Sequence, residues 1–200
     1  MKPRSVHLPD GRVWLRVADP DWRDPLDPSF ARRDGGRWNP PASYDTLYLN
    51  GDVTTARLQI DRLLAGSPVH PDDLDDDAYL LVAATLPRGQ ICAEAVSAPG
   101  LRALDLPPGY PLDDEGNPLP REVCQQIGAD VQGMGLRGVW AISAAGPDGE
   151  GRELAWFPAT SRSRARAVWN APLPLGGWRY AAEWTDIGLE DQAEPRRVST

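Results

Sequence analysis

The stretch GGRWNPPASYDTLYLNGDVTTARLQIDRLL, residues 35–64, joins a glycine pair, a proline-rich turn, a short apolar run and an amphipathic segment. The glycine pair permits a tight turn and the close approach of a ligand to Arg37, because glycine has no Cβ. The apolar run at 46–50 predicts a short buried strand. After it, Asp52 is a helix N-cap residue and Gly66 is a helix stop. The stretch therefore predicts a turn, a strand and a helix in close succession.

The predicted helix has one apolar face. Its apolar positions follow the spacing i, i+4, i+7 and i+8, at Ala56, Ile60, Leu63 and Leu64. Gln59 comes three residues after Ala56 and four before Leu63. Its side chain is therefore predicted to face the protein and not the solvent.

The remaining chain predicts many short strands and few helices. Strands are predicted by apolar or alternating runs at 12–18, 79–86, 89–96, 136–145 and 154–159, with a shorter one within 101–108 and a further one at 178–184. A second helix is predicted over 121–134. Residues 19–36 are interrupted by prolines and predict a loop. This order predicts an α+β fold in a single domain over 1–185, followed by a frayed polar tail over 186–200.

Charge and hydropathy limit the function classes. The chain has 200 residues and a net charge of −8, and the sequence pI is about 4.8. Such acidity argues against nucleic acid as a direct partner, because phosphate binding needs a basic face. No uncharged apolar run approaches the ~18 residues of a membrane span, and the N-terminus lacks the apolar segment of a signal peptide. We therefore expect a cytoplasmic protein that does not span a membrane.

The cysteines and the arginine clusters allow further expectations. Cys92 and Cys124 lie far apart and lack the spacing of metal ligands, so we expect buried thiols, no disulfide and no metal site. Arginines cluster at 31–37 and 162–168. Such clusters can hold a small anion or an acidic partner. The cluster at 162–168 is more typical of solvated charges paired along a helix.

The sequence lacks the usual catalytic motifs. It has no GxxxxGK[ST] loop, no GxGxxG after a strand and no GxSxG. The two histidines, His7 and His70, lie outside any recognisable motif, so a Ser-His-Asp triad or a histidine-ligated metal has no support. Any enzymatic reaction must then depend on positioning and electrostatics.

Three residues have the chemistry for such a site. Arg37 could clamp a phosphate with its guanidinium. Tyr48 could stack on an aromatic ring, and Ser143, at the end of an apolar strand, could point its hydroxyl into a cleft. Each residue also has a purely structural interpretation: an ion pair of Arg37 with Asp34 or Asp45, a core position for Tyr48, and a strand-end cap for Ser143.

Two blocks of the sequence resemble the RES-domain family, which is named for its Arg, Glu and Ser residues. The first block is the stretch at 35–64, with its GGRWN turn, its strand containing Tyr-Leu and its helix with Ala near the start. The second is GLRGVWAISAAGPDGEGRELAWFPA at 135–159, an apolar strand ending in Ser-Ala, a polar loop and another apolar strand. WLRVAD at 14–19 resembles the family's opening strand. The resemblance extends over about residues 10–170.

This resemblance implies an ADP-ribosyltransferase-like fold and the function of a toxin from a bacterial toxin–antitoxin pair. Family members consume NAD+ by hydrolysis or phosphorolysis, or transfer ADP-ribose to a protein. NAD+ is thus implied as substrate, with no further cofactor, and a helix-turn-helix antitoxin as the partner that blocks the site. By motif, Arg16 and Arg37 would hold the pyrophosphate and nicotinamide-ribose region. Tyr48 would pack against the nicotinamide or its ribose, and Ser143 would hydrogen-bond the substrate.

The sequence departs from the family at its glutamate. Counting three residues from Ala56 places Gln59 there, so the expected catalytic set is Arg37, Gln59 and Ser143. Cleavage of the nicotinamide–ribose bond builds positive charge on the ribose, and loss of one electrostatic contact to a transition state typically costs about 100- to 1,000-fold in rate. Asp61 lies about 200° around the helix from Gln59 and cannot replace the lost charge.

Three interpretations of Gln59 therefore stay open. The enzyme could be weak or altered in specificity, as a hydrolase, a phosphorylase or a protein ADP-ribosyltransferase. Another carboxylate, such as Glu153, could take the place of the glutamate. Alternatively, the domain could bind a nucleotide without cleaving it.

Overall fold

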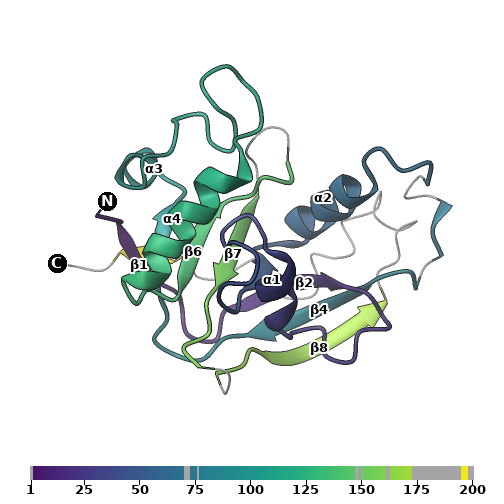
Figure 1. Cartoon of the computed structure of the whole chain (residues 1–200). Helices are drawn as coiled ribbons and strands as arrows, with labels where there is room; N and C mark the ends of the chain where they lie inside the picture. The colour runs from purple at the N-terminus through teal and green to yellow at the C-terminus, as the bar shows by residue number, and fades with distance from the viewer. Residues whose placement is uncertain are drawn as a thin grey trace.

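Nine strands of the described chain form one sheet, in the order β8-β4-β2-β3-β7-β6-β5-β1-β9 (Figure 1). The structure is a computed structural model that describes residues 2–69, 73–75, 77–146, 149, 151–160, 163–172 and 195–197. The strands are β1 (Ser5–His7), β2 (Val13–Ala18), β3 (Leu47–Asn50), β4 (Leu80–Thr85), β5 (Ile91–Ala95), β6 (Gly138–Ile142), β7 (Arg152–Trp156), β8 (Arg166–Pro172) and β9 (Arg196–Arg197). Neighbouring strands run antiparallel except β5 and β6, which are parallel.

Four helices accompany the sheet in the described residues: α1 (Ser29–Asp34), α2 (Val53–Leu64), α3 (Ala98–Ala103) and α4 (Arg121–Gly133). Helix α2 contacts β2 and β3, α3 contacts β5, and α4 contacts β6. Figure 1 shows β7 in the middle of the molecule, with α4 to one side and α2 to the other. The predicted α+β fold with few helices is confirmed.

Helix α2 begins where its sequence predicts. The side chain of Asp52 accepts a hydrogen bond from the backbone N–H of Thr55 at 2.6 Å, which satisfies one of the free donors of the first turn. The helix ends at Leu64, just before Gly66, which has a φ of +83°. Ala56 and Ile60 are buried against the sheet. Leu63 is 62% exposed, so the apolar face is narrower than predicted.

The pleat of β2 separates two apolar layers. Leu15 and Val17 pack with Ala56 and Ile60 of α2 on one face of the sheet. Trp14 packs on the other face in a separate cluster. Successive residues of a strand point to opposite faces, so the parity along β2 decides which side chains can reach the α2 side.

The structure overturns two predictions of local structure, the strand within 101–108 and the loop over the whole of 19–36. The segment 101–108 begins in helix α3, whose N-cap Ser97 accepts from the N–H of Gly100. The segment 19–36 is a loop only as far as its last proline, Pro28, after which α1 forms. A proline at a helix N-terminus removes no helical hydrogen bond and so permits the helix.

The charge pattern at 162–168, which is typical of a helix, also gave the wrong element, because pairing with another strand decides the structure there. The arginine-rich segment 162–168 forms no helix among its described residues; from Arg166 on it is strand β8, paired with β4. In the predicted frayed tail, Arg196 and Arg197 pair with β1, a strand that was not predicted. The strand expected at 178–184 and the residue His70 lie outside the described residues.

Gly128 of α4 provides a test of the packing between α4 and the turn after α1. A Cβ at Gly128 would overlap the carbonyl oxygen of Trp38, which is fully buried. We expect Gly128→Ala to lower the free energy of unfolding by about 1–3 kcal/mol, the usual cost of overpacking. Urea denaturation measures the change.

Gly133, on the same helix, is the matched control because no atom lies within 4 Å of a Cβ placed there. Gly133→Ala should be neutral or stabilising by up to about 1 kcal/mol, since alanine is the better helix former. Equal effects of the two substitutions would show that Gly128 is not packed against Trp38.

Candidate functional site

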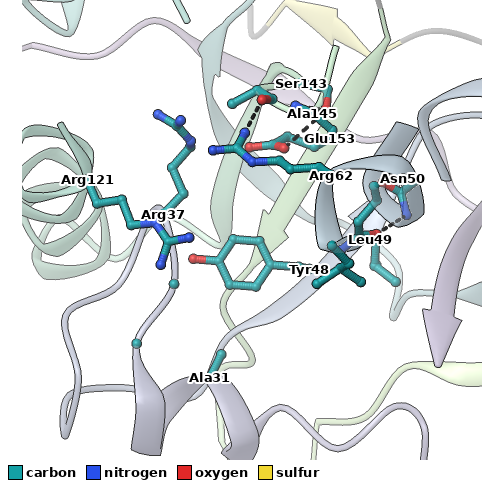
Figure 2. A pocket seen from close by; sticks show the side chains of 15 residues that line it. Ala31, Arg37, Tyr48, Leu49, Asn50, Arg62, Arg121, Ser143, Ala145 and Glu153 are labelled. Carbon is teal, nitrogen blue, oxygen red and sulfur yellow. Dashed lines mark hydrogen bonds between the residues drawn. The ribbon is translucent and has the colours of Figure 1, made fainter. Parts of the chain in front are cut away.

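Four of the five predicted site residues line one pocket. The pocket has a volume of about 430 Å3 and lies between the turn after α1, the end of β3, helix α2 and the loop after β6. Arg37, Tyr48 and Ser143 contribute to its lining (Figure 2), and so does Gln59. Segments separated by more than a hundred residues therefore meet at one place.

Tyr48 positions the turn that carries Arg37. Its hydroxyl accepts from the backbone N–H of Trp38 at 2.7 Å and donates to Oδ1 of Asn39 at 2.8 Å. A Cβ at Gly36 would overlap the Tyr48 ring, so the absence of a side chain there lets the turn lie against the tyrosine. Burial raises the pKa of Tyr48 above its ordinary value. Tyr48 thus both lines the pocket and holds the turn in place.

Arg37 lies over the first turn of α4. One guanidinium nitrogen donates to Sγ of Cys124 at 3.5 Å, and the guanidinium carbon lies 5.9 Å from the centroid of the Tyr110 ring. Helix α4 also holds the turn directly, because Nε2 of Gln125 donates to the carbonyl of Gly36 at 2.9 Å. The arginine therefore has a fixed position with its charge available to the pocket.

The ion pairs proposed as a structural role for Arg37 are not formed. Asp34 pairs with Arg33 at 2.7 Å, and Asp45 pairs with Arg32 at 3.3 Å. Both carboxylates thus have other partners on or near α1. The geometry favours a ligand-binding role for Arg37 over a structural ion pair.

Gln59 is oriented by the end of β3. Its side-chain oxygen accepts from Nδ2 of Asn50 at 2.9 Å. The oxygen keeps a second lone pair and the NH2 group can donate, so Gln59 offers the pocket an amide that can both donate and accept. This amide supplies no negative charge.

Glu153 places a carboxylate in the same pocket. It lies on β7 directly opposite Asn50 in the β3–β7 ladder. Its Oε1 accepts from the indole N–H of Trp38 at 3.1 Å, and its Oε2 accepts from the hydroxyl of Ser143 at 3.4 Å. Burial raises the pKa of Glu153, and the hydrogen bond from Trp38 and the charge of Arg37 only partly offset the effect.

Ser143 follows β6 and is buried. Its hydroxyl accepts from the backbone N–H of Ala145 at 3.2 Å, as expected for a cap at a strand end. It also donates to Glu153, as described above. The structural and the site interpretations of Ser143 are therefore compatible.

Two further arginines line the pocket and were not singled out from the sequence. Arg62 lies on α2 and donates to the carbonyl of Ala144, while Arg121 is the first residue of α4. Burial, followed by the charges of Arg37 and Arg121, lowers the pKa of Arg62. The spacing of Arg62, three residues after Gln59, could have predicted a shared helix face. Arg121 carries no comparable signal.

Arg16 does not join the site. Its neighbour Leu15 pairs with Asn50, which lines the pocket, so Arg16 points to the opposite face of the sheet. There its guanidinium lies 5.5 Å from the ring centroid of Trp22. Burial lowers its pKa to about 10, despite the opposing effects of Asp27 and Asp24. The substrate-binding role predicted for Arg16 has no geometric support.

The described part of the chain contains no group of three or more His, Cys, Asp and Glu side chains that could hold a metal ion. Within the same residues, every helix is too short or too polar to cross a bilayer. Cys92 and Cys124 are free and buried, as predicted.

One solved structure identifies the fold. No protein-family model and no curated protein matches the chain. A chain of the M. tuberculosis MbcT-MbcA toxin-antitoxin complex is similar to it in structure, with a TM-score of 0.71 and 18% sequence identity. The match covers 88% of this chain and 91% of that chain. At this identity the likeness shows the fold, and it agrees with the fold that the sequence resemblance implied.

Tyr48→Phe tests whether the tyrosine hydroxyl holds the turn. The substitution leaves the N–H of Trp38 and the amide of Asn39 without their partner in a buried environment. We expect the free energy of unfolding to fall by about 1–3 kcal/mol, as measured by chemical denaturation. Tyr79→Phe, in a partly buried tyrosine outside the turn, should change it by less than about 0.5 kcal/mol. Similar small effects at both positions would contradict the role given to Tyr48.

Glu153→Gln tests the raised pKa of the Glu153 carboxyl. A carboxyl whose pKa is higher in the folded than in the unfolded state stabilises the fold below its unfolded pKa. That stabilisation is lost as the pH rises through the folded pKa. We therefore compare the melting temperature of Glu153→Gln with that of the wild type at two pH values. The difference, variant minus wild type, should be larger at pH 7.5 than at pH 4, by about 2–4 °C for each kcal/mol of unfolding free energy that the wild type loses as the carboxyl ionises.

The exposed Glu115, in a surface turn, gives the control for this comparison. Glu115→Gln should show the same melting-temperature difference from wild type at both pH values. If the melting-temperature difference between Glu153→Gln and the wild type does not change with pH, the folded protein does not disfavour the ionised form of Glu153.

Proposed function

We propose that this protein is a RES-type toxin that consumes NAD+ by breaking its nicotinamide–ribose bond. The observation that carries the proposal is the single pocket in which Arg37, Tyr48, Gln59 and Ser143 meet in the order and spacing of the RES signature. The fold shared with a chain of a toxin-antitoxin complex supports it independently.

The charge of the pocket suits a dinucleotide. Arg37, Arg62 and Arg121 line it from three different elements, and a guanidinium binds phosphate oxygens with two parallel hydrogen bonds. A diphosphate bridging two nucleosides would neutralise this positive charge. We therefore assign the arginines to the pyrophosphate of NAD+.

The remaining groups then surround the ribose and the nicotinamide. We assign the Tyr48 ring, which lines the pocket, to the nicotinamide, because aromatic rings pack favourably in offset-stacked or edge-to-face arrangements. The amide of Gln59 can hydrogen-bond to a ribose hydroxyl, and Ser143 lines the same pocket. Breaking the C1′–N bond leaves the electron pair on the nicotinamide nitrogen and a positive charge on the ribose, which the site must stabilise.

Under this proposal the acceptor of the ADP-ribosyl group is water or phosphate, with a protein side chain as the alternative. The chemistry of Gln59 favours one further candidate. Since Gln59 supplies an uncharged amide where the family has a negative charge, the pocket could hold NAD+ without cleaving it. We infer a cognate helix-turn-helix antitoxin that blocks the pocket, and a cytoplasmic site of action, where NAD+ is the substrate.

Arg37→Ala tests the proposal. The purified wild-type chain should release nicotinamide from NAD+, and removal of the phosphate clamp should lower kcat/KM by at least about 100-fold. Chromatography of the products, with and without phosphate, separates ADP-ribose from ADP-ribose phosphate. A labelled-NAD+ incubation with cell extract detects transfer to protein.

Arg33→Ala is the matched control, because Arg33 is exposed on α1, forms an ion pair with the neighbouring Asp34 and is not among the residues that line the pocket containing Arg37. It should leave NAD+ turnover unchanged. Folded wild-type protein that leaves NAD+ intact under all of these conditions would refute catalysis. Binding of NAD+ without turnover would then favour the non-catalytic candidate.

A further inference from the structure

The position of Glu153 is unusual for a charged residue. It lies on β7, a central strand of the sheet, with β3 on one side and β6 on the other. Its ladder partners there are Asn50 and Ala141. A half-buried carboxylate in such a place is costly unless it is hydrogen-bonded, and carboxyl groups with perturbed titration cluster at functional sites.

The hydrogen bonds of Glu153 aim its carboxylate without neutralising it. The Trp38 indole and the Ser143 hydroxyl are both uncharged donors. None of the ion pairs formed between described residues involves Glu153. Its negative charge is therefore held in a defined orientation and is not cancelled by a direct partner.

Titratable groups on several elements interact electrostatically with Glu153. Arg37 in the turn, Tyr48 on β3 and Arg62 on α2 do so from the lining of the same pocket. Tyr110 and Cys124, which pack in one core cluster with α4, also interact with it. Figure 2 shows the Arg62 side chain beside Glu153 and Ser143.

Glu153 and Gln59 are linked through one residue. Asn50 donates to Gln59 and is the ladder partner of Glu153. The two side chains thus belong to the same wall of the same pocket, one reaching in from the helix and the other from the strand. A charge missing from the helix position can therefore be supplied within the same pocket from the strand position.

We propose that Glu153 is the catalytic carboxylate of this protein and takes the electrostatic role that Gln59 cannot perform. The proposal rests on the NAD+-consuming function argued above. As the C1′–N bond breaks, its electron pair leaves with nicotinamide, and the Glu153 carboxylate stabilises the positive charge left on the ribose. When water is the acceptor, its oxygen bonds to C1′ and its proton passes to Glu153.

Four chains test this assignment: wild type, Glu153→Gln, Gln59→Glu and the double variant that carries both changes. Glutamine keeps the shape of Glu153 and an acceptor for Trp38. The charge role therefore predicts a fall in kcat of about 100- to 1,000-fold for Glu153→Gln. The Kd for NAD+, measured by calorimetry, should change by less than about threefold. The double variant should recover at least about tenfold in kcat, because a carboxylate returns to the same wall.

The outcomes separate the inference from the function on which it rests. If the Glu153→Gln variant has the same kcat as the wild type, Glu153 is a structural residue. That result would overturn this inference and leave the proposed function standing. The inference would also be overturned if the wild-type chain left NAD+ intact while the Gln59→Glu variant cleaved it. Glu153 would then not replace the missing charge. Folded wild-type and Gln59→Glu chains that both leave NAD+ intact would refute the proposed function itself.

The pH profile gives a second measurement should Glu153→Gln fail to fold. Glu153 acts in its ionised form, so wild-type kcat should fall as the pH decreases through a step above the ordinary pKa of a glutamate, about 4.3. The control Glu115→Gln should share this profile. A wild-type kcat that stays constant across that range would overturn the inference.

Discussion

The two hydrogen bonds of the Tyr48 hydroxyl fix the turn on which the site depends. They join the end of a central strand to Trp38 and Asn39, both of which are fully buried. Any other arrangement of the turn would leave buried polar groups without partners, which costs more than the hydrogen bonds themselves contribute. The position of Arg37 follows from this constraint, because it lies between Gly36, packed on the tyrosine ring, and Trp38.

The turn that carries Arg37 also orients the negative charge of Glu153. The indole of Trp38 donates to Glu153, so the residue next to the arginine also aims the carboxylate. A positive and a negative group are thereby fixed on rigid elements before any ligand enters. Groups held in this way need little reorganisation when charge develops in a reaction. The stability lost by burying Glu153 is consistent with selection for a site and not for a stable core.

Local patterns in the sequence predicted the parts of the fold that depend on local chemistry. Helix α2 begins at Asp52 because a side-chain cap is a short-range interaction, and the spacing of Gln59 correctly placed it toward the protein. Arg16 could not be placed in the same way. Its face depends on the register between β2 and β3, which involves residues far apart in the chain. Strand β8 was likewise missed, because only its pairing with β4 makes Arg166 part of a strand.

The composition of the pocket explains why one carboxylate, and not two, suits the proposed substrate. Among the described lining residues, Arg37, Arg62 and Arg121 accompany one carboxylate, Glu153, which leaves these residues with an excess of positive charge for a diphosphate. A second carboxylate at position 59 would reduce that excess and would oppose the ionisation of Glu153, since like charges raise each other's pKa. Under the proposed function, the uncharged amide of Gln59 and the carboxylate of Glu153 therefore belong to one electrostatic arrangement.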